Sequence, residues 1–175
     1  MKAKYIQVAI DVLEHWHGFA EEPVVPCTEQ EIAAMAARLP GGRIPEAYRE
    51  LLAYGGRKLG GVYGAVDISY EMTWALLSHD YRDIVAMIRP WDKDVMLPPE
   101  LFVINEHLGS NFTFVRLDEG DDPPVYLWEE GEGGLEVATR EHDTFSAFLV
   151  ELVQQHIRHR DSGAQLQASL PQTRL

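Results

Sequence analysis

The chain has 175 residues, a length typical of one domain, and 46% of them are hydrophobic, which is enough for a core and excludes wholesale disorder. It contains 28 acidic and 15 basic residues, a net charge of −13, which argues against binding to nucleic acid or to anionic membranes. No apolar run approaches about 18 residues, so no transmembrane helix is expected. The first residues do not form a signal-peptide pattern and Cys27 is the only cysteine, so we expect a cytoplasmic protein without an internal disulfide.

The N-terminal part of the chain is predicted to be helical. Residues 3–19 carry apolar side chains at steps of three and four, the spacing of an amphipathic helix. Residues 21–26 contain two prolines and are predicted to connect this helix to a second one, which starts at a Thr28/Glu31 capping box and ends at Pro40. The predicted buried stripe of the first helix consists of Tyr5, Val8, Val12, Trp16 and Phe19.

A third helix is predicted over residues 46–54, after a turn at residues 41–42. Pro45 suits its first position, and Gly55 and Gly56 are predicted to end it through a left-handed C-cap. Residues 60–69 are predicted to form a glycine-interrupted strand. Residues 70–88 are predicted to be mostly helical, followed by a loop with prolines at both ends. The apolar stripe of that helical segment consists of Trp74, Leu77, Tyr81, Ile84 and Ile88.

The second half of the chain is predicted to contain consecutive strands, over residues 101–105, 111–117, 124–129 and 134–139. Alternate residues of the second strand are apolar on both faces, as in a sheet that is covered on both sides. A closing helix is predicted after a cap at Asp143 or Thr144. Its apolar positions are Phe145, Phe148, Leu149, Leu152, Val153 and Ile157.

Consecutive strands joined by short turns indicate an antiparallel meander, and helices grouped apart from the strands indicate the α+β class. The predicted fold is therefore a single α+β domain with a mainly antiparallel central sheet and helices packed around it. We place this domain at residues 1–160. Residues 161–175 are rich in Gln and Ser and are predicted to form a flexible C-terminal tail.

Residues 117–136 concentrate negative charge around one short apolar strand, and no Lys or Arg lies between Arg116 and Arg140. Such a stretch has three interpretations: a solvated loop, a set of metal-binding or catalytic carboxylates, or a surface for a basic partner. Asp92 and Asp94 lie in the proline-bounded loop and are predicted to extend the same face, together with Glu100. The eight carboxylates of the stretch are Asp118, Glu119, Asp121, Asp122, Glu129, Glu130, Glu132 and Glu136.

Two segments resemble the SUKH superfamily, also described as the Smi/Knr domain, and together they span most of residues 39–152. The first has a proline-started helix that ends in Gly-Gly. The second has an apolar strand, a glycine turn, a V-Y-x-W strand and a closing helix around Phe-x-x-Phe-Leu. The matching residues of the first segment are Pro45, Tyr48, Leu51, Leu52, Gly55 and Gly56. Those of the second are Phe102, Ile104, Gly109, Val125, Tyr126, Trp128, Phe145, Phe148 and Leu149.

This resemblance implies an α+β fold and a protein that binds other proteins. It implies most directly a bacterial immunity protein, which neutralises a cognate secreted toxin by direct contact. The alternative is a regulatory scaffold of the cell-wall-regulator type, with no toxin partner. Pro45, Gly55, Gly56 and Gly109 are expected to be structural. The candidate partner-binding residues are Asp118, Glu119, Asp121, Asp122, Trp128, Glu129, Glu130, Glu132, Asp92 and Asp94.

Other candidate sites have weaker support. His156 and His159 share a helix face but lack a third metal ligand, so solvated histidines are the preferred interpretation. Ser78, His79 and Asp80 are adjacent in sequence, whereas the members of a catalytic triad meet through the fold. We therefore expect no enzymatic activity, no metal and no cofactor. The expected partner is a basic toxin domain, and the expected state is a monomer or weak homodimer.

Overall fold

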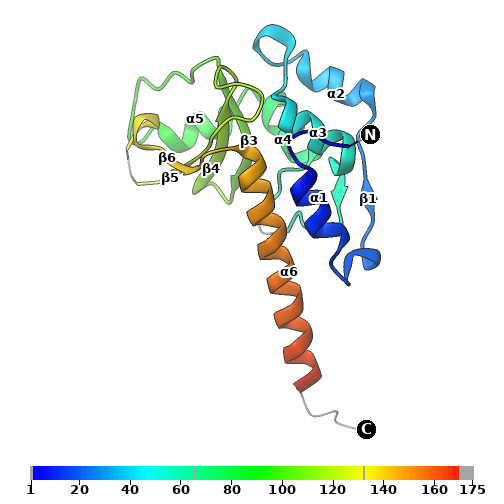
Figure 1. Cartoon of the computed structure of the whole chain (residues 1–175). Helices are drawn as coiled ribbons and strands as arrows, with labels where there is room; N and C mark the ends of the chain where they lie inside the picture. The colour runs from blue at the N-terminus through cyan, green and yellow to red at the C-terminus, as the bar shows by residue number, and fades with distance from the viewer. Residues whose placement is uncertain (1, 65, 132, 170–175) are drawn as a thin grey trace.

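The computed structural model describes residues 2–64, 66–131 and 133–169 (Figure 1). Its central element is a four-stranded antiparallel sheet in the order β3-β4-β5-β6, and a two-stranded sheet pairs β1 with β2. The fold is a single α+β domain, as predicted. The elements are α1 (Gln7–Glu14), η1 (Phe19–Glu21), β1 (Val24–Val25), α2 (Glu29–Ala36), η2 (Pro40–Gly42), α3 (Glu46–Gly55), β2 (Lys58–Leu59), α4 (Tyr70–Ser78), α5 (Arg82–Ile88), β3 (Leu101–His107), β4 (Asn111–Arg116), β5 (Val125–Glu129), η3 (Leu135–Val137), β6 (Thr139–His142) and α6 (Phe145–Ser169).

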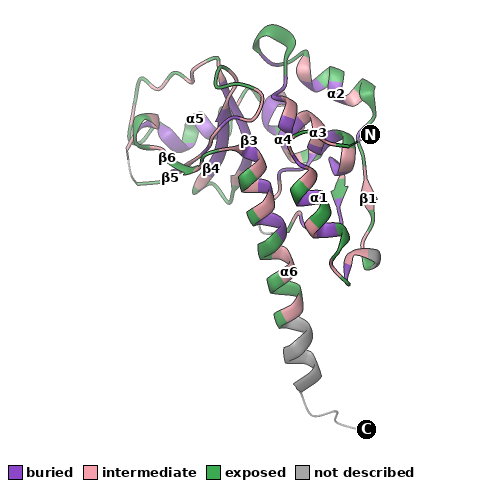
Figure 2. Ribbon diagram, in the orientation of Figure 1, coloured by how far each residue is buried: buried purple, intermediate pink, exposed green. Residues whose placement is uncertain are grey.

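The central sheet separates two hydrophobic clusters, so both of its faces are covered. Phe102, Val115 and Val125 belong to the larger cluster, which also contains residues of α1, α3 and α6. Phe112 and Trp128 belong to the smaller cluster, with residues of α4 and α5. Figure 2 shows buried residues along the strands and on the helices next to them. The apolar alternation of β4 thus correctly predicted a sheet between two layers.

Helix α1 is shorter than predicted, and its buried face differs from the predicted stripe. The carboxylate of Glu50 accepts hydrogen bonds from the backbone amides of Lys4, Tyr5 and Ile6, which fixes these residues just before the helix begins. Val8 was placed on the buried stripe but is 60% exposed. The buried residues of α1 are Ala9, Ile10 and Leu13.

The capping box of α2 is confirmed, because the Thr28 side chain accepts from the Glu31 amide and the Glu31 carboxylate accepts from the Thr28 amide. The predicted left-handed C-cap of α3 is wrong: Gly56 has a φ of −60°. These glycines allow close packing instead. A Cβ atom on Gly56 would lie 2.6 Å from Leu52 Cα, and one on Gly55 would lie 2.7 Å from Leu59 Cδ1.

The other structural residues also have clear positions. Pro45 was predicted at the first position of α3. It is instead the N-cap residue, directly before the helix begins at Glu46. Gly109 has a φ of 71° and forms the turn between β3 and β4 together with Leu108, whose φ is 52°. Two successive left-handed residues are typical of tight β-hairpins, and the second of them is favourable for glycine.

Three predicted segments differ from the structure. Residues 60–69 form no strand where they are described, and β1 and β2 are two residues long each. The predicted helical segment 70–88 is split into α4 and α5, because Asp80 and Tyr81 adopt positive φ values of 50° and 51°. The last strand begins later than predicted, at Thr139: residues 135–137 form η3, and Trp128 Nε1 donates to the carbonyls of Gly133 and Gly134 just before it.

Helix α6 closes the domain and then extends beyond it (Figure 1). Thr144 Oγ1 accepts from the Ala147 amide, so the predicted Thr144 cap is confirmed. Near the other end of the packed part, the Trp16 indole donates to the Asp161 carboxylate at 3.0 Å. The helical backbone continues to Ser169, and residues 170–175 of the predicted tail lie outside the described residues. Among the helices of the described ranges, none has the length and apolarity needed to span a bilayer.

Candidate functional site

The acidic residues of segment 117–136 are divided between the two ends of the central sheet. Residues Asp118 to Asp122 lie in the loop before β5, whereas Glu129 and Glu130 lie at the end of β5 and directly after it. The predicted acidic face is therefore divided into two groups, one at each end of β5. We call the first group the β4–β5 loop. Glu132 lies outside the described residues.

Three carboxylates of the β4–β5 loop contact other parts of the fold. Glu119 accepts from the Tyr126 hydroxyl at 3.0 and 3.1 Å. Asp121 forms an ion pair with Arg43. Asp122 accepts from the Ser146 amide at 2.8 Å and from its hydroxyl at 2.6 Å. Asp118 is exposed and takes part in none of the ion pairs found among the described side chains.

The same loop satisfies the N-terminal ends of two helices. The Asp122 carboxylate reaches the first turn of α6 through Ser146, and the Asp121 carbonyl accepts from the Ala47 amide in the first turn of α3. The first amides of a helix have no partner within the helix, and negative charge near them is favourable. The β4–β5 loop therefore joins α3 to α6, a structural role in addition to any role in binding.

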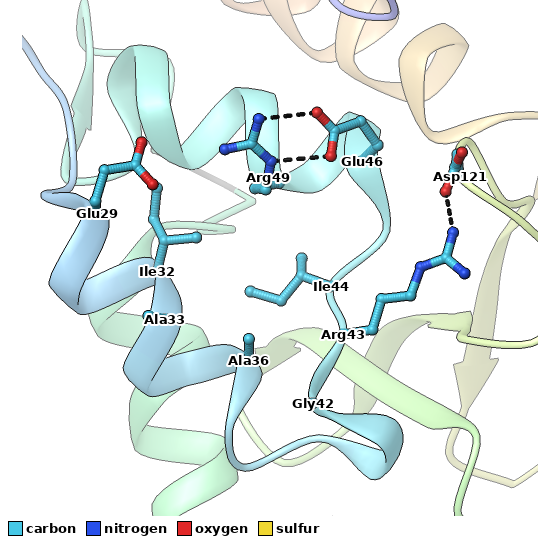
Figure 3. Close-up of a pocket in the computed structure, with 10 residues that line it drawn as sticks. All are labelled: Glu29, Ile32, Ala33, Ala36, Gly42, Arg43, Ile44, Glu46, Arg49 and Asp121. Atoms are coloured by element: carbon cyan, nitrogen blue, oxygen red, sulfur yellow. Dashed lines mark hydrogen bonds and ion pairs between the residues drawn. The ribbon is translucent and has the colours of Figure 1, made fainter.

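A groove of about 540 Å³ opens beside this loop (Figure 3). We call it the α2 groove. One side is formed by α2 and the other by residues 42–44 and the start of α3, with Asp121 at its edge. Sequence reasoning placed Asp121 on an acidic face but gave no sign of a groove next to it, because its lining comes from three separate segments. Its lining residues include Ile32, Ala33, Ala36, Arg43, Ile44 and Asp121.

The opposite end of the sheet carries a second acidic group, which we call the distal acidic end: Asp92, Asp94, Glu129 and Glu130. The segments meet at Trp91, since a Cβ atom on Gly131 would lie 3.9 Å from Trp91 Cζ2. None of the four carboxylates belongs to an ion pair within the described part of the chain. Lys93 lies between two of them in sequence, so the local charge remains negative.

The distal acidic end also exposes apolar side chains that sequence reasoning did not single out. Trp91 is 49% exposed, and Leu108, at the tip of the β3–β4 hairpin, is 88% exposed. The Glu130 amide donates to the Ser110 carbonyl at 2.7 Å, which places this hairpin tip beside the acidic residues. A left-handed backbone costs a non-glycine residue about 1 kcal/mol or more, so leucine is an unfavourable choice at this turn.

Trp128, in contrast, is fully buried. Its ring stacks on Phe112 at 5.2 Å between centroids, and its N–H is satisfied by two backbone carbonyls. This corrects the expectation that Trp128 contacts a partner. The exposed aromatic residue among the carboxylates is Trp91, and its signal in the sequence was its position between Pro90 and Asp92.

The titratable residues give little support to a catalytic site. Burial raises the pKa of the Cys27 thiol to about 12, so the thiolate is scarce at neutral pH. Burial also lowers the pKa of His156, whose ring packs edge-on against Trp16 with its Nε2 buried, whereas His159 is exposed as expected. Across the described ranges, no group of three or more His, Cys, Asp or Glu residues could hold a metal ion.

The Glu31 carboxylate has a clear structural role as a partner of Arg57. Arg57 forms ion pairs with Glu31 of α2 and Glu71 of α4, and its guanidinium lies 5.4 Å from the centroid of the Tyr70 ring. The hydrogen bond from Arg57 lowers the pKa of Glu31 to about 2. Arg57 therefore links α2 to α4 across the chain segment that follows α3.

The comparisons with known proteins agree with this architecture. The curated proteins give no significant match to the sequence. A model of the SMI1 / KNR4 family (SUKH-1) matches residues 26–151, which include every strand of the central sheet and the start of α6. The match covers well over half of the sequence, and the chain belongs to the SMI1/KNR4 family (SUKH-1).

Proposed function

We propose that this chain is an immunity protein that binds a cognate toxin domain and neutralises it by direct contact. The family fits immunity proteins and regulators of the Knr4 type, which are generally not catalytic. The observation that carries the proposal is the distal acidic end, where carboxylates without an ion pair among the described residues lie in the same segments as exposed Trp91 and beside the hairpin tip of Leu108.

This arrangement has the composition of a protein-binding surface. Aromatic side chains that become buried supply much of the affinity of an interface, whereas charged residues around them mainly raise the association rate and select the partner. A net charge of −13 favours a basic partner. We therefore propose a toxin domain with a basic surface, as in enzymes whose substrates carry phosphate groups.

The first test is the gene neighbourhood: immunity predicts that a gene for a secreted toxin lies directly upstream, and its toxin domain would then be used as the partner. Co-expression of the chain should restore growth of cells that produce the toxin domain, and the purified pair should associate at a rate that falls as salt is added. Trp91→Ala should raise koff by about 30-fold or more, as expected for a central aromatic residue that contributes about 2 kcal/mol.

The charge contribution is tested by a matched pair of variants. Glu129→Gln with Glu130→Gln should lower kon and flatten its salt dependence. Asp118→Asn with Glu141→Gln removes the same number of exposed carboxylates elsewhere and should change kon less. Equal effects of the two double variants would mean that net charge alone, and not the distal acidic end, directs the encounter.

A regulatory scaffold with no toxin partner is the alternative function. It has one supporting observation, a second candidate surface at the α2 groove, since a scaffold must hold more than one protein. Failure of the chain to protect cells from any toxin domain encoded nearby, together with capture of a host protein through Trp91, would favour the scaffold.

A further inference from the structure

The last contacts between α6 and the rest of the domain form a seam that we call the α6 clasp: residues 16–22 against residues 156–161. Within it, the Trp16 indole donates to the Asp161 carboxylate at 3.0 Å. Earlier residues of α6, such as Val153, are buried in the larger hydrophobic cluster, whereas no residue from 156 to 161 is fully buried. Beyond the clasp, the helix extends past the domain (Figure 1). The clasp can therefore open while the core stays intact.

His156 is enclosed by this clasp. Its ring packs edge-on against Trp16, with 5.5 Å between the ring centroids. A Cβ atom on Gly61 would lie 3.4 Å from His156 Cε1 and 3.2 Å from Glu22 Cγ, so both side chains lie against the Gly61 backbone. The Nε2 atom of His156 is buried and has no hydrogen-bond partner within the described part of the chain. A neutral ring is tolerated in such a place, whereas a charged N–H without an acceptor is much more costly.

The charges that face His156 come from its own helix and from the segment opposite. Burial is the largest influence and lowers the pKa of His156. The Arg160 guanidinium, one turn later on α6, lowers this pKa further, and the charge of His159 acts in the same direction. Glu22, from the opposite segment, raises it but does not reverse the result. The third segment contacts the ring through Gly61, which carries no charge.

Two charged contacts accompany the ring in the clasp. Arg160 donates to Glu21 at 3.2 Å, and arginine stays charged at all pH values of interest. His17 Nε2 lies 3.7 Å from the Asp161 carboxylate, and the His17 side chain is 82% exposed. Protonation of His17 favours the closed clasp only slightly, because exposed ion pairs contribute little. Protonation of the enclosed His156 acts against closure and has the larger effect.

We propose that the α6 clasp is an acid-sensitive switch, in which protonation of His156 releases residues 156–162 from residues 16–22 while the central sheet stays folded. The closed clasp binds this proton less readily than the open one, in which the histidine has a pKa of about 6.5. Closure is therefore fully favoured above about pH 7 and weakens as the pH falls below about 6.5. Opening lengthens the part of α6 that projects from the domain (Figure 1).

NMR of the full chain tests the direction of this effect. The Hε1 resonance of His156 should titrate with a midpoint below the value of about 6.5 for an unfolded chain. The Trp16 indole N–H, which is bound to Asp161, should lose protection from solvent exchange several-fold between about pH 7 and pH 5, after correction for the intrinsic exchange rate. A midpoint at or above about 6.5 would mean that the imidazolium pairs with Glu22 and tightens the clasp, which would overturn the proposal. Unchanged protection of the indole would overturn it as well.

A pair of variants assigns the effect to one residue. His156→Phe keeps a ring against Trp16 but cannot be protonated, so protection of the Trp16 indole should no longer depend on pH over this range. His159→Gln is the matched control, because it removes an exposed imidazole from the same helix and should leave the pH dependence nearly unchanged. If His156→Phe keeps the pH dependence of the unmodified chain, other groups cause it and the proposal is wrong. These measurements need no partner, so their outcome is independent of toxin binding at the distal acidic end.

Discussion

The two ends of the central sheet carry similar numbers of carboxylates but use them differently. At the β4–β5 loop, Glu119, Asp121 and Asp122 bind a tyrosine hydroxyl, an arginine and the first turn of α6. At the distal acidic end, Glu129 and Glu130 are exposed and directly precede Gly131, which lies next to the exposed Trp91. The comparison teaches that local charge density does not define a role: the same sequence stretch supplies helix caps at one end and an open surface at the other.

The difference follows from what lies next to each end. The β4–β5 loop faces the N-termini of α3 and α6, whose first amides donate to the Asp121 carbonyl and to the Asp122 carboxylate. The distal acidic end faces a hairpin tip and a loop, and neither provides a helix N-terminus for its carboxylates. Substitutions at the β4–β5 loop should therefore lower stability, whereas substitutions at the distal acidic end should leave it nearly unchanged.

The largest effect on stability is expected for Trp128, which was predicted to contact a partner but is buried in the core. Trp128→Ala should lower the free energy of unfolding by about 3–5 kcal/mol, because a fully buried ring leaves a cavity. Urea denaturation measures this. A variant that keeps its stability but loses partner binding would return Trp128 to the interface.

A smaller loss is expected at the β4–β5 loop. Asp122→Ala should cost about 1–2 kcal/mol, because the Ser146 amide loses its acceptor. Asp118→Ala should stay within about 0.5 kcal/mol, since Asp118 is exposed. Equal stability of the two variants in thermal or urea denaturation would show that the loop is only solvated.

Glu31 gives a test by pH. Its pKa is lowered in the folded state to about 2, so its contribution to stability is present above the unfolded pKa of about 4.3 and is lost as pH falls toward 2. The stability difference between the unmodified chain and Glu31→Gln should therefore be constant above pH 6 and shrink below pH 4. A difference that does not change with pH would mean that the ion pair with Arg57 is not formed.

The smallest effect on stability is expected at the distal acidic end. Glu129→Gln and Glu130→Gln should each change the free energy of unfolding by no more than about 0.5 kcal/mol. Removing one of two adjacent like charges should raise it slightly. A loss comparable to that of Asp122→Ala would show that these residues support the fold and would weaken the proposed interface.

The sequence predicted the fold class well, because the relevant signals are local. The capping box at Thr28, the two-sided apolar pattern of β4 and the apolar stripe of α6 each reflect contacts within or directly across one element. Family resemblance then supplied their order. The stripe of α1 was misplaced because the helix start depends on Glu50, which is 44 residues from Ile6.

The candidate site was harder to predict for the same reason. Whether a carboxylate is exposed or capped depends on a helix from elsewhere in the chain, as Asp122 and Ser146 show. The α2 groove is assembled from three segments, so no single stretch reports it. The exposure of Trp91 and the burial of Trp128 could not be distinguished by residue type, since both are tryptophans beside acidic residues.

The hydrogen bond between Trp16 and Asp161 has a consequence for synthesis of the protein. It joins residues 145 positions apart, and Arg160 pairs with Glu21 nearby. At a translation rate of about 5–20 residues per second, α1 waits on the order of ten seconds before its partner helix leaves the ribosome. During that interval α1 has its contacts with α3 but lacks those with α6, so the N-terminal segment of nascent chains stalled near residue 140 should be cleaved by proteases that spare the finished protein.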